Sequence, residues 1–541
     1  MNKLRLSLAA ALAVLLHATP ASSVEVELTN FDAGTGAGLD DPSPRAPVGG
    51  NPGTTLGQQR QIAYQFAADL WSTVLDGETP VRVTASTQPL SCTPTSGTLA
   101  QAGALSVYRN FPGSIPNTWY HVALAKGITG IDLPTSSGFD ILTQFNGAIG
   151  VDPNCLTGSD WYYGLDGNTP AGKINFLNVV MHEIGHGLGF SGFENVSSGQ
   201  PLAGTPSIYA TYAFDNTQGQ LVRNMTAAQR VAAFVNDGNL VWTGPNVTAQ
   251  APLVLDYAVV LRASAPAAIA GNEYDAVAAA FGPAATPGSF AGAVAVANDG
   301  TGPTATLACQ PLQNAAEVAG KLALVDRGVC AFAVKAANAQ AAGATGVIIA
   351  NSAGGAFAPG GTAADVTIPV IGVAQATGAA FKANSAGLAA ALVQSGTRLA
   401  GADAAGRVQM YAPTARAPGS TYSHFDTRVS PNALMEPFNT ASIQANYSID
   451  LTPALFADEG WPLDTGSARI GDCDTGVAVQ QEGGLIIGAN LVAQSNVCKI
   501  GARNHGQYVS CMSGHTNALR AAGLLPAGSH GAIQRCVAKN K

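Results

Sequence analysis

The chain has 541 residues, which is too long for one ordinary hydrophobic core and indicates two to four domains. With 47% hydrophobic and only 11% charged residues it can bury sizeable cores, so its composition excludes an intrinsically disordered protein. The formal net charge of -8 comes without any run of lysines and arginines, which argues against nucleic acid as a partner.

The first 23 residues have the pattern of a secretory signal peptide. Lys3 and Arg5 form a basic start, residues 6–16 are an apolar run too short to span a bilayer, and residues 18–23 are small and suited to cleavage. The alternative is an N-terminal membrane anchor, which the short apolar run disfavours. Glycine and alanine break up every later apolar stretch. We therefore expect no stable membrane insertion and a mature protein that is secreted or periplasmic.

Eight cysteines fit an oxidising compartment, because an even count in an exported chain usually means disulfides. The alternative, a cysteine metal site, is disfavoured because the chain has no C-x-x-C pair. The cysteines form three groups, which suggests domains: Cys92 and Cys155; Cys309 and Cys330; Cys473, Cys498, Cys511 and Cys536. The last four allow three pairings, and the sequence does not choose among them.

The N-terminal part of the chain contains three predicted elements. Residues 24–60 are rich in glycine, proline and aspartate, so we expect them to be largely irregular. Apolar residues at helical spacing predict a helix over 57–75, and alternation predicts a strand over 81–85. A second helical pattern covers 174–188, with Gly189 as the stop signal.

Two changes of composition mark further segments. Residues 191–252 form a connecting segment with a predicted helix over 226–235. Within the alanine- and glycine-rich residues 253–415, short buried strands are predicted at 322–325, 347–350 and 370–373, with a helix over 333–342. Strands that alternate with helices predict a small α/β unit. From residue 469 the chain becomes a short, cysteine-rich tail.

The second predicted helix carries the sequence H-E-x-x-H. The spacing of His182 and His186 puts both imidazoles on one helical face, where they can bind one zinc ion. Glu183 can then take a proton from a water that the zinc ion has activated for attack on an amide carbonyl. The alternative is a pair of helix-surface histidines, which the amphipathic helix, the exported chain and the scarcity of histidines disfavour.

A catalytic zinc site needs a third protein ligand. Gly189 ends the helix as in the extended motif H-E-x-x-H-x-x-G-x-x-H, but Gly192 stands where that motif has its third histidine. The next histidine in the chain is His424, in S-H-F-D at 423–426. The glutamates between the motif and His424 are Glu194, Glu273 and Glu317. They are the other candidates, and we prefer His424.

The blocks H-E-I-G-H-G-L-G-F at 182–190, S-H-F-D and the following L-M-E-P at 434–437 together resemble the leishmanolysin-like metzincins. In that family a long insertion separates the second histidine from the third, and a methionine-containing turn runs beneath the metal. The resemblance implies His424 as third zinc ligand and Met435 as the Met-turn residue. It also implies an α+β metzincin-like catalytic domain, with a twisted sheet and an active-site helix, in two parts at 24–190 and 416–468. The alternatives are a surface-loop histidine and an ordinary core methionine.

A second resemblance lies within the gap between the histidine blocks. The chain reads K-L-A-L-V-D-R-G-V-C at 321–330, A-G-A at 342–344, V-I-I-A-N at 347–351 and I-P-V-I at 368–371. This order and spacing resemble a protease-associated (PA) domain, which implies a small α/β insertion over 253–415 with Cys309 paired to Cys330. The resemblance implies an association with secreted peptidases, several of which carry such an insertion, and an influence on substrate access or binding. The turn at 326–328 could be a binding loop, although a plain strand-to-loop turn accounts for it.

The tail, residues 469–541, resembles a short cysteine-containing helical module appended to various secreted bacterial proteins. Its three histidines could suggest a second metal site, but we favour the interpretation as solvated surface histidines: His505, His515 and His530.

Taken together, these patterns predict a secreted zinc endopeptidase that acts on protein or peptide substrates. His182, His186 and His424 would hold Zn²⁺, with Glu183 as general base and Met435 below the site. Two other functions stay open: an exported binding or adhesion protein with an inactive protease-like domain, and a zinc hydrolase of a non-peptide bond. The retained glutamate counts against the first, because a binder needs no general base. Tyr422 and Tyr447 are candidates for stabilising the oxyanion by proximity alone, and the sequence does not determine the oligomeric state.

Overall fold

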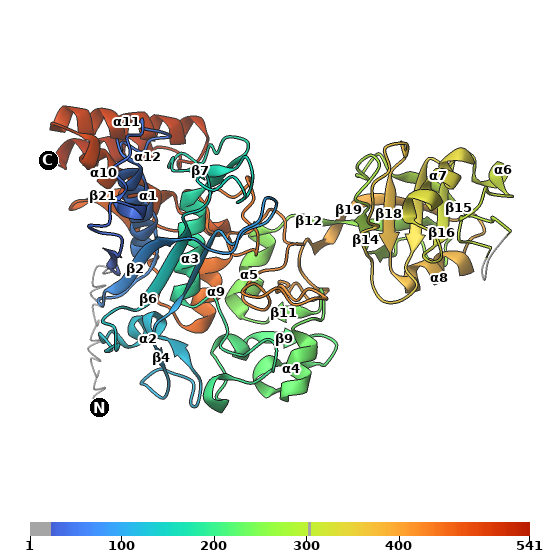
Figure 1. The fold of residues 1–541 in the computed structure, drawn as a ribbon, viewed down its shortest axis with the longest axis horizontal. Coiled ribbons are helices and arrows are strands. Elements are labelled where there is room, and N and C mark those ends of the chain that lie inside the picture. Colours follow the sequence, from blue (N-terminus) through green and yellow to red (C-terminus); the bar gives the residue numbers. More distant parts are fainter. Residues whose placement is uncertain (1–22, 301–304, 541) are drawn as a thin grey trace, which may run out of the picture. The chain divides into compact units, whose positions relative to one another are not determined.

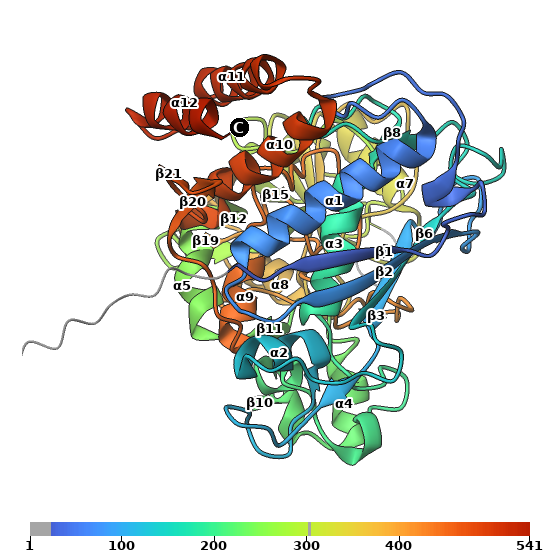
Figure 2. The same ribbon diagram turned by 90° about the vertical axis from the view of Figure 1, so that its left-hand side faces the viewer.

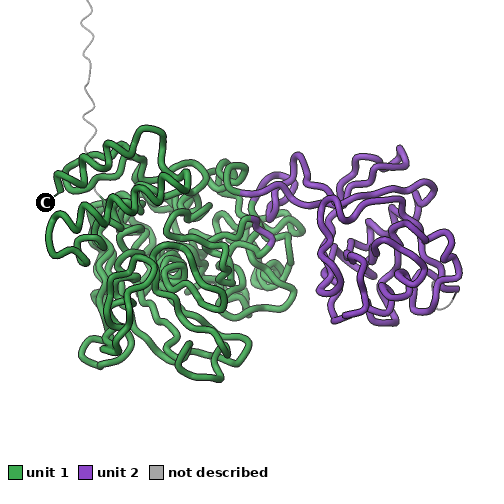
Figure 3. The backbone as a smooth tube through the Cα atoms, turned by 90° about the horizontal axis from the view of Figure 1, so that it is seen from above, with its two compact units in different colours: residues 1–254, 408–427, 431–541 green, residues 255–407, 428–430 purple. Residues whose placement is uncertain are grey.

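The computed structural model describes residues 23–300 and 305–540, so the expected signal peptide lies outside the described residues except for Ser23. The chain divides into two compact units, drawn in green and purple in Figure 3. The first comprises residues 1–254, 408–427 and 431–541, and the second comprises residues 255–407 and 428–430. In sequence, the second unit is therefore an insertion into the first. No helix in the described part of the chain is long and apolar enough to span a membrane.

The first unit is built on a four-stranded sheet. In order across the sheet, the strands are β1 (Val26–Asn30), β2 (Val81–Gln88), β6 (Ile141–Asn146) and β3 (Ala100–Ala104). The first three run parallel, and β3 pairs antiparallel with β6 and forms an edge of the sheet. The strand predicted from residue 81 is confirmed and continues to Gln88. The expectation of irregular chain is wrong for β1, because pairing with β2 orders this short segment.

Two long helices pack on one face of this sheet, and Figure 2 shows how they cross. They are α1 (Leu56–Val74) and α3 (Phe176–Leu188), close to the predicted ranges. The hydroxyl of Tyr64 on α1 lies 2.7 Å from Oγ1 of Thr143 on β6, and Phe145, two residues further along β6, contacts Phe176 of α3 with ring centroids 4.9 Å apart. Thr55 and Gln58 form a capping box that starts α1.

Shorter elements complete the part of the first unit that precedes the insertion. They are α2 (Val122–Thr129), the strand pairs β4 (Val107–Tyr108) with β5 (Tyr120–His121) and β7 (Asp160–Tyr162) with β8 (Lys173–Asn175), the three-stranded sheet β10 (Gln220–Leu221), β9 (Ala213–Asp215) and β11 (Leu240–Trp242), the helices α4 (Ala227–Ala233) and α5 (Pro245–Val254), and the 3-10 turns η1 (Gly38–Asp40), η2 (Leu202–Gly204), η3 (Tyr209–Thr211) and η4 (Val222–Asn224). The helix predicted in the connecting segment is therefore present as α4.

After the insertion the chain returns to the first unit and ends in a helical module. Its elements are α9 (Thr452–Glu459), β20 (Ser467–Ile470), β21 (Cys473–Ala478), η5 (Glu482–Gly484), α10 (Ile487–Gly501), α11 (His505–Ala521) and α12 (Ser529–Lys539). α10 lies against α1, where the Asn496 side chain donates to Asp69 at 2.9 Å. Figure 1 shows α10, α11 and α12 grouped together. The cysteine-rich tail thus packs on the helix that covers the sheet.

The second unit contains an eight-stranded mixed sheet. Its order is β13 (Glu273–Tyr274), β12 (Tyr257–Ala265), β19 (Ala389–Leu399), β15 (Ala291–Val296), β16 (Leu322–Asp326), β17 (Gly346–Ala350), β18 (Val370–Val373) and β14 (Ala276–Ala278), with helices α6 (Ala315–Val318), α7 (Phe332–Ala341) and α8 (Gln375–Ala383). The strands from β15 to β18 run parallel, and α7 and α8 contribute to separate apolar clusters on the two faces of the sheet. The predicted strand–helix alternation of this region is confirmed.

Candidate metal centre

Helix α3 carries two of the three histidines. The Asn175 side chain caps its first turn by accepting from the N–H of Asn178, and the helix ends at Leu188, with Gly189 as its C-cap. A Cβ on Gly187 would lie 2.3 Å from the side chain of Ile141, so a glycine is needed for α3 to pack this closely on β6. The helix is thereby fixed against the sheet.

The third histidine, His424, lies in the segment that returns from the insertion. Its carbonyl oxygen accepts from the N–H of Tyr411 at 2.9 Å, and the N–H of the next residue, Phe425, donates to the carbonyl of Met435 at 2.9 Å. These backbone bonds hold His424 between two neighbouring segments.

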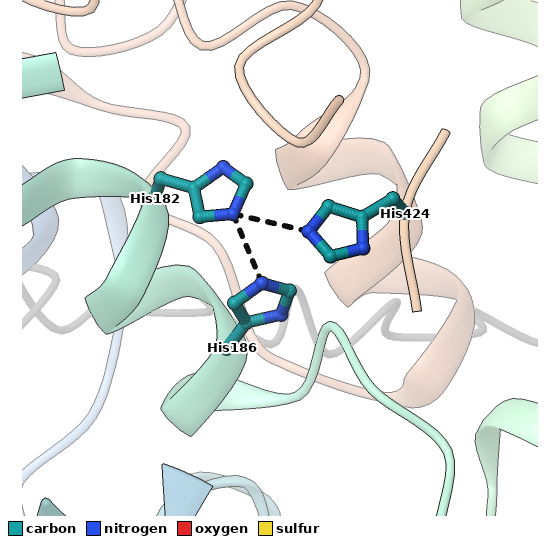
Figure 4. A group of neighbouring side chains, drawn as sticks. All are labelled: His182, His186 and His424. Carbon is teal, nitrogen blue, oxygen red and sulfur yellow. Dashed lines mark hydrogen bonds between the residues drawn. The ribbon is translucent and has the colours of Figure 1, made fainter. Parts of the chain in front are cut away.

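The structure brings the three imidazoles together (Figure 4). Nε2 of His182 lies 3.0 Å from Nε2 of His186 and 3.2 Å from Nε2 of His424. In the described part of the chain this is the one group of three or more histidine, cysteine or acidic side chains whose ligand atoms all lie within 4.8 Å of one another. Nitrogens bound at about 2.0–2.1 Å to a tetrahedral zinc ion are about 3.3 Å apart, so this donor set fits zinc.

The second nitrogen of each ring is held by a backbone carbonyl. The pairs are Nδ1 of His182 with Leu434 at 2.7 Å, of His186 with Phe190 at 2.8 Å, and of His424 with Ser420 at 2.7 Å. A proton on Nδ1 leaves the lone pair of Nε2 directed at the shared point. Burial lowers the pKa of His182 to about 4 and that of His424 to about 3, and it moves the pKa of His186 well below its ordinary value. The rings are therefore neutral near pH 7, as metal ligands must be.

Glu183 lies beside this cluster with 6% of its surface exposed. Together with the three histidines it lines a cavity of about 790 Å³. Burial raises the pKa of its carboxyl group to about 8. The cavity is also lined by every residue of the edge strand β3, and none of its described lining residues is a lysine or arginine. A buried carboxyl, three converging imidazole nitrogens and an unpaired strand edge thus meet in one cleft.

Met435 lies in a turn next to α3. A Cβ on Gly185 would stand 3.0 Å from its Sδ, so the turn packs directly against the helix between the two histidines. Two carboxyl groups hold the turn: Asp450 accepts from the N–H of Leu434 at 2.6 Å, and Glu436 accepts from the N–H of Ala433 at 2.8 Å. Sequence reasoning assigned neither acid a role: Asp450 belongs to no motif, and Glu436 stands in the L-M-E-P block without any signal that it binds the backbone of Ala433.

The other candidates from the sequence do not join the cluster. Glu194 accepts bonds from the N–H and hydroxyl of Ser207, each at 2.8 Å, and from the hydroxyl of Tyr422 at 3.2 Å. The Glu194 carboxylate therefore has a structural role, and both of its oxygens accept hydrogen bonds away from the histidine cluster. Tyr422 is buried and Tyr447 packs in the core of the C-terminal module, and neither is among the lining residues of the cavity. Their suggested oxyanion role receives no support.

The three tail histidines make separate hydrogen bonds. His505 contacts the carbonyl of Ala538 at 3.1 Å, His530 the side chain of Asn517 at 3.0 Å, and His515 the side chain of Asn490 at 2.7 Å. They do not form a three-residue metal group within the described chain. For His515 the interpretation as a solvated surface histidine is also wrong. This side chain is partly buried between α10 and α11, and burial lowers its pKa to about 4.

All eight cysteines are paired. The disulfides join Cys92 to Cys155, Cys309 to Cys330, Cys473 to Cys536 and Cys498 to Cys511. The structure thus selects one of the three pairings that the sequence left open in the tail, and it confirms the pairing that the second resemblance implied.

Comparison with known proteins identifies one part of the chain. A family model described as the PA domain matches residues 250–381. No curated protein matches the chain significantly. Three solved structures are similar to part of the chain. A zinc aminopeptidase from Bacillus subtilis is 24% identical over 27% of this chain and 35% of that chain, with a TM-score of 0.18. An aminopeptidase from an Aneurinibacillus species is 23% identical over 26% of this chain and 32% of that chain (TM-score 0.20), and a psychrophilic subtilisin-like protease from an Antarctic Pseudoalteromonas is 20% identical over 27% of this chain and 34% of that chain (TM-score 0.20).

The chain spans about a third of the length of these solved structures, and TM-scores this low support no inference about the unit that holds the three histidines. The family match does not depend on them. It lies over the strands and helices of the second unit, from β12 to α8. The chain therefore consists of a mixed α/β unit with a histidine cluster and, inserted into its sequence, a PA domain.

Proposed function

We propose that this protein is an exported, zinc-dependent endopeptidase. The observation that carries the proposal is the convergence of three Nε2 atoms, each with its Nδ1 held by a backbone carbonyl, beside a buried glutamate in an open cleft. The resemblance of the two histidine blocks to leishmanolysin-like metzincins supports the same function, and so does the PA domain, which the resemblance associates with secreted peptidases. Four disulfides agree with an oxidising compartment outside the cytoplasm.

His182, His186 and His424 would hold the zinc ion. When bound, zinc supplies Lewis-acid chemistry: it lowers the pKa of a water molecule and polarises a carbonyl oxygen. Glu183 takes the proton of the attacking water and passes it to the leaving amine, and its burial suits a group that must hold a proton during the reaction. A cation beside this carboxyl would lower its pKa from the raised value towards the neutral range.

The substrate would bind as an extended strand along β3. This strand is an edge of the sheet, so one side of its backbone is free to pair, and all five of its residues line the cavity. Pairing with an edge strand fixes a peptide by backbone bonds and requires no particular side chains. Because β3 lines the cavity along its whole length, a chain could extend to both sides of the cleaved bond, which favours endopeptidase action.

The two other functions are less well supported. A pure binding protein has no use for a buried carboxyl next to three metal-binding nitrogens. A zinc hydrolase of another bond could use the same centre, but a free strand edge along the cleft is suited to a peptide backbone.

The test is hydrolysis of a peptide blocked at both ends, and of casein, by the full-length zinc-loaded protein. A Glu183→Gln variant with the same zinc content should show background activity, while the matched exposed variant Glu482→Gln should match the wild type. A His424→Ala variant should lose zinc. If the wild-type protein holds zinc and cleaves neither substrate, the peptidase proposal fails. Cleavage of casein without cleavage of the blocked peptide would instead point to an enzyme that needs a free terminus.

A further inference from the structure

The helices of the C-terminal module differ in charge from the rest of the chain. Residues 485–541 contain six lysines and arginines and neither aspartate nor glutamate. The residues before them contain the other 20 lysines and arginines and all 34 aspartates and glutamates. A protein with a formal net charge of -8 therefore includes one segment that carries only positive charge.

The cations of this segment lie on its surface. The apolar sides of α10, α11 and α12 are buried together, with Leu491, Met512 and Ile533 in one core, so each helix keeps its charged side chains outside. Five of the six cations belong to the described residues, and all five are exposed: Lys499, Arg503, Arg520, Arg535 and Lys539. None of the ion pairs in the described part of the chain includes any of them.

Three of these cations gather at one corner of the module. Lys499 lies in the last turn of α10, and Arg503 lies in the bend between α10 and α11. Nε2 of His505, the first residue of α11, contacts the backbone of α12 at 3.1 Å, which brings the last turn of α12, with Lys539, beside this bend. Ile500, next to Lys499, is 59% exposed. We call Lys499, Ile500, Arg503 and Lys539 the basic corner.

The neighbouring strand pair does not neutralise this charge. β21 packs against α12, and Asp472 and Asp474 lie at the start of β21. The Asp474 carboxylate accepts from the hydroxyl of Ser467 at 2.6 Å and from the N–H of Gly476 at 2.7 Å. Neither aspartate forms an ion pair with a cation of the described residues. The positive charge of the basic corner therefore remains available to a partner.

The side chains of the segment discriminate between anionic partners. Proteins bind single-stranded nucleic acid by stacking its bases on exposed aromatic side chains. The one aromatic residue of this segment, Tyr508, is buried. An exposed isoleucine beside cations instead suits a lipid surface, where anionic headgroups attract the cations and the interfacial layer accepts the apolar side chain.

We propose that the basic corner docks the protein on a membrane surface that contains anionic phospholipids. Lys499, Arg503 and Lys539 pair with headgroup phosphates, and Ile500 enters the interfacial layer. The contact is peripheral and requires no membrane-spanning segment. It uses no residue of the histidine cluster, so it stands independently of the peptidase proposal.

The experiment is co-sedimentation with vesicles of the protein from which the expected signal peptide has been removed, because that peptide would itself bind lipid. One kind of vesicle is phosphatidylcholine alone, and the other contains about 30% phosphatidylglycerol. The protein should bind the second kind at least about tenfold more tightly, because each cation at an anionic surface raises the affinity roughly fivefold. High ionic strength should weaken this binding, since salt screens exposed charges.

A triple variant assigns the binding to the basic corner. Lys499→Gln, Arg503→Gln and Lys539→Gln, combined in one protein, should weaken binding to the anionic vesicles about a hundredfold. The matched control removes three cations that lie outside the module and form no ion pair among the described residues, and it should bind like the wild type: Arg45→Gln, Lys321→Gln and Arg416→Gln.

A single variant tests the apolar part of the contact. Ile500→Ser should weaken binding to the anionic vesicles about tenfold, because the interfacial layer no longer buries an aliphatic side chain. Its control is Val151→Ser, at a residue of the same unit that is 74% exposed, and this change should leave the binding as it is.

Melting temperatures close to that of the wild type would show that the variants fold. The proposal is overturned if the protein binds neither kind of vesicle or both equally, or if the triple variant of the basic corner binds like the wild type. Equal losses in the two triple variants would also overturn it, because the attraction would then depend on total charge. So would tighter binding to single-stranded DNA than to the anionic vesicles, measured by fluorescence anisotropy.

Discussion

The carbonyl oxygen of Leu434 accepts a hydrogen bond from Nδ1 of His182 at 2.7 Å, which joins the turn before Met435 to the first histidine of the cluster. The N–H of the same Leu434 donates to the carboxylate of Asp450 at 2.6 Å. The orientation of the His182 ring therefore depends on the carboxylate of Asp450, which acts on the ring through the backbone of Leu434. Groups that orient metal ligands in this way typically affect metal affinity strongly.

We predict that Asp450→Ala weakens zinc binding about tenfold, because Leu434 loses the acceptor that fixes its backbone. Asp450→Asn keeps one acceptor oxygen and tolerates the φ of +44° at this position, so it should recover most of the affinity. Zinc affinity measured by competition with a chelator would check this. Equal affinities in all three proteins would show that Asp450 has no part in positioning His182.

A second prediction concerns the contact between Gly185 and Met435 next to the histidine cluster. Gly185→Ala would place a Cβ 3.0 Å from Sδ and 3.4 Å from Cε of Met435, and such overpacking costs about 1–3 kcal/mol. We expect a lower melting temperature, together with lower zinc affinity as the turn is displaced. In the double variant with Met435→Ala, the combined destabilisation should be smaller than the sum of the two single effects, since the clash is gone.

The matched control for the Gly185→Ala variant is Gly514→Ala in α11. A Cβ at Gly514 meets no atom within 4 Å, and alanine is the better helix former, so this variant should melt at the same temperature or higher. Strictly additive effects of Gly185→Ala and Met435→Ala would contradict the proposed contact.

The two disulfides of the C-terminal module should differ in their contribution to stability. Cys473–Cys536 closes a loop with a sequence separation of 63, and Cys498–Cys511 one of 13. From the entropy of loop closure alone, the longer loop should raise the free energy of unfolding by about 4 kcal/mol and the shorter loop by about 3 kcal/mol. Replacing both cysteines of the longer loop by serine should therefore lower the melting temperature more than the same change in the shorter loop. The reverse order, seen by differential scanning fluorimetry, would show that native contacts outweigh loop entropy.

The C-terminal module should also lose stability in acid through His515. Burial lowers its pKa to about 4, so the folded state favours the neutral ring. A depressed folded-state pKa means that this stability is complete above the unfolded value of about 6.5 and is lost as the pH falls from there towards 4, by at most about 3 kcal/mol.

His515→Gln should therefore flatten the loss of melting temperature between pH 6.5 and 4. The control is His530→Gln, because the hydrogen bond of His530 to Asn517 is exposed. If both variants and the wild type show the same pH dependence, His515 is not the group that titrates.

The residues of the histidine cluster could be predicted from the sequence, whereas the groups that hold them in place could not. His182, Glu183 and His186 share one helix, and their spacing alone places them on neighbouring positions. His424 lies beyond the insertion, and no local pattern connects it to the helix, so it could be chosen only as the next histidine in the chain and through the resemblance. The carbonyl partners of the rings and the carboxylate of Asp450 could not be predicted, because backbone partners leave no signature in side-chain identity.

The fold shows the same contrast between local and tertiary signals. Helix α1 has helical periodicity and a capping box, and its limits were predicted to within one residue. Strand β1 does alternate, from Val24 to Thr29, but the glycine- and proline-rich composition of residues 24–60 hides this short signal. Strand β3 consists only of alanine, glycine and glutamine, and its pairing with β6 creates it. The interpretation of His515 as a surface residue is wrong, because only the packing of α11 on α10 reveals that it is partly buried.

The three histidines of the cluster are synthesised in an order that bears on the proposed activity. His182 and His186 leave the ribosome before the PA domain, and His424 leaves after it. A chain that stops anywhere within the PA domain therefore carries the complete H-E-x-x-H helix but only two of its three histidines. On the proposed function, a chain could become proteolytically active only after the inserted domain has been completely synthesised.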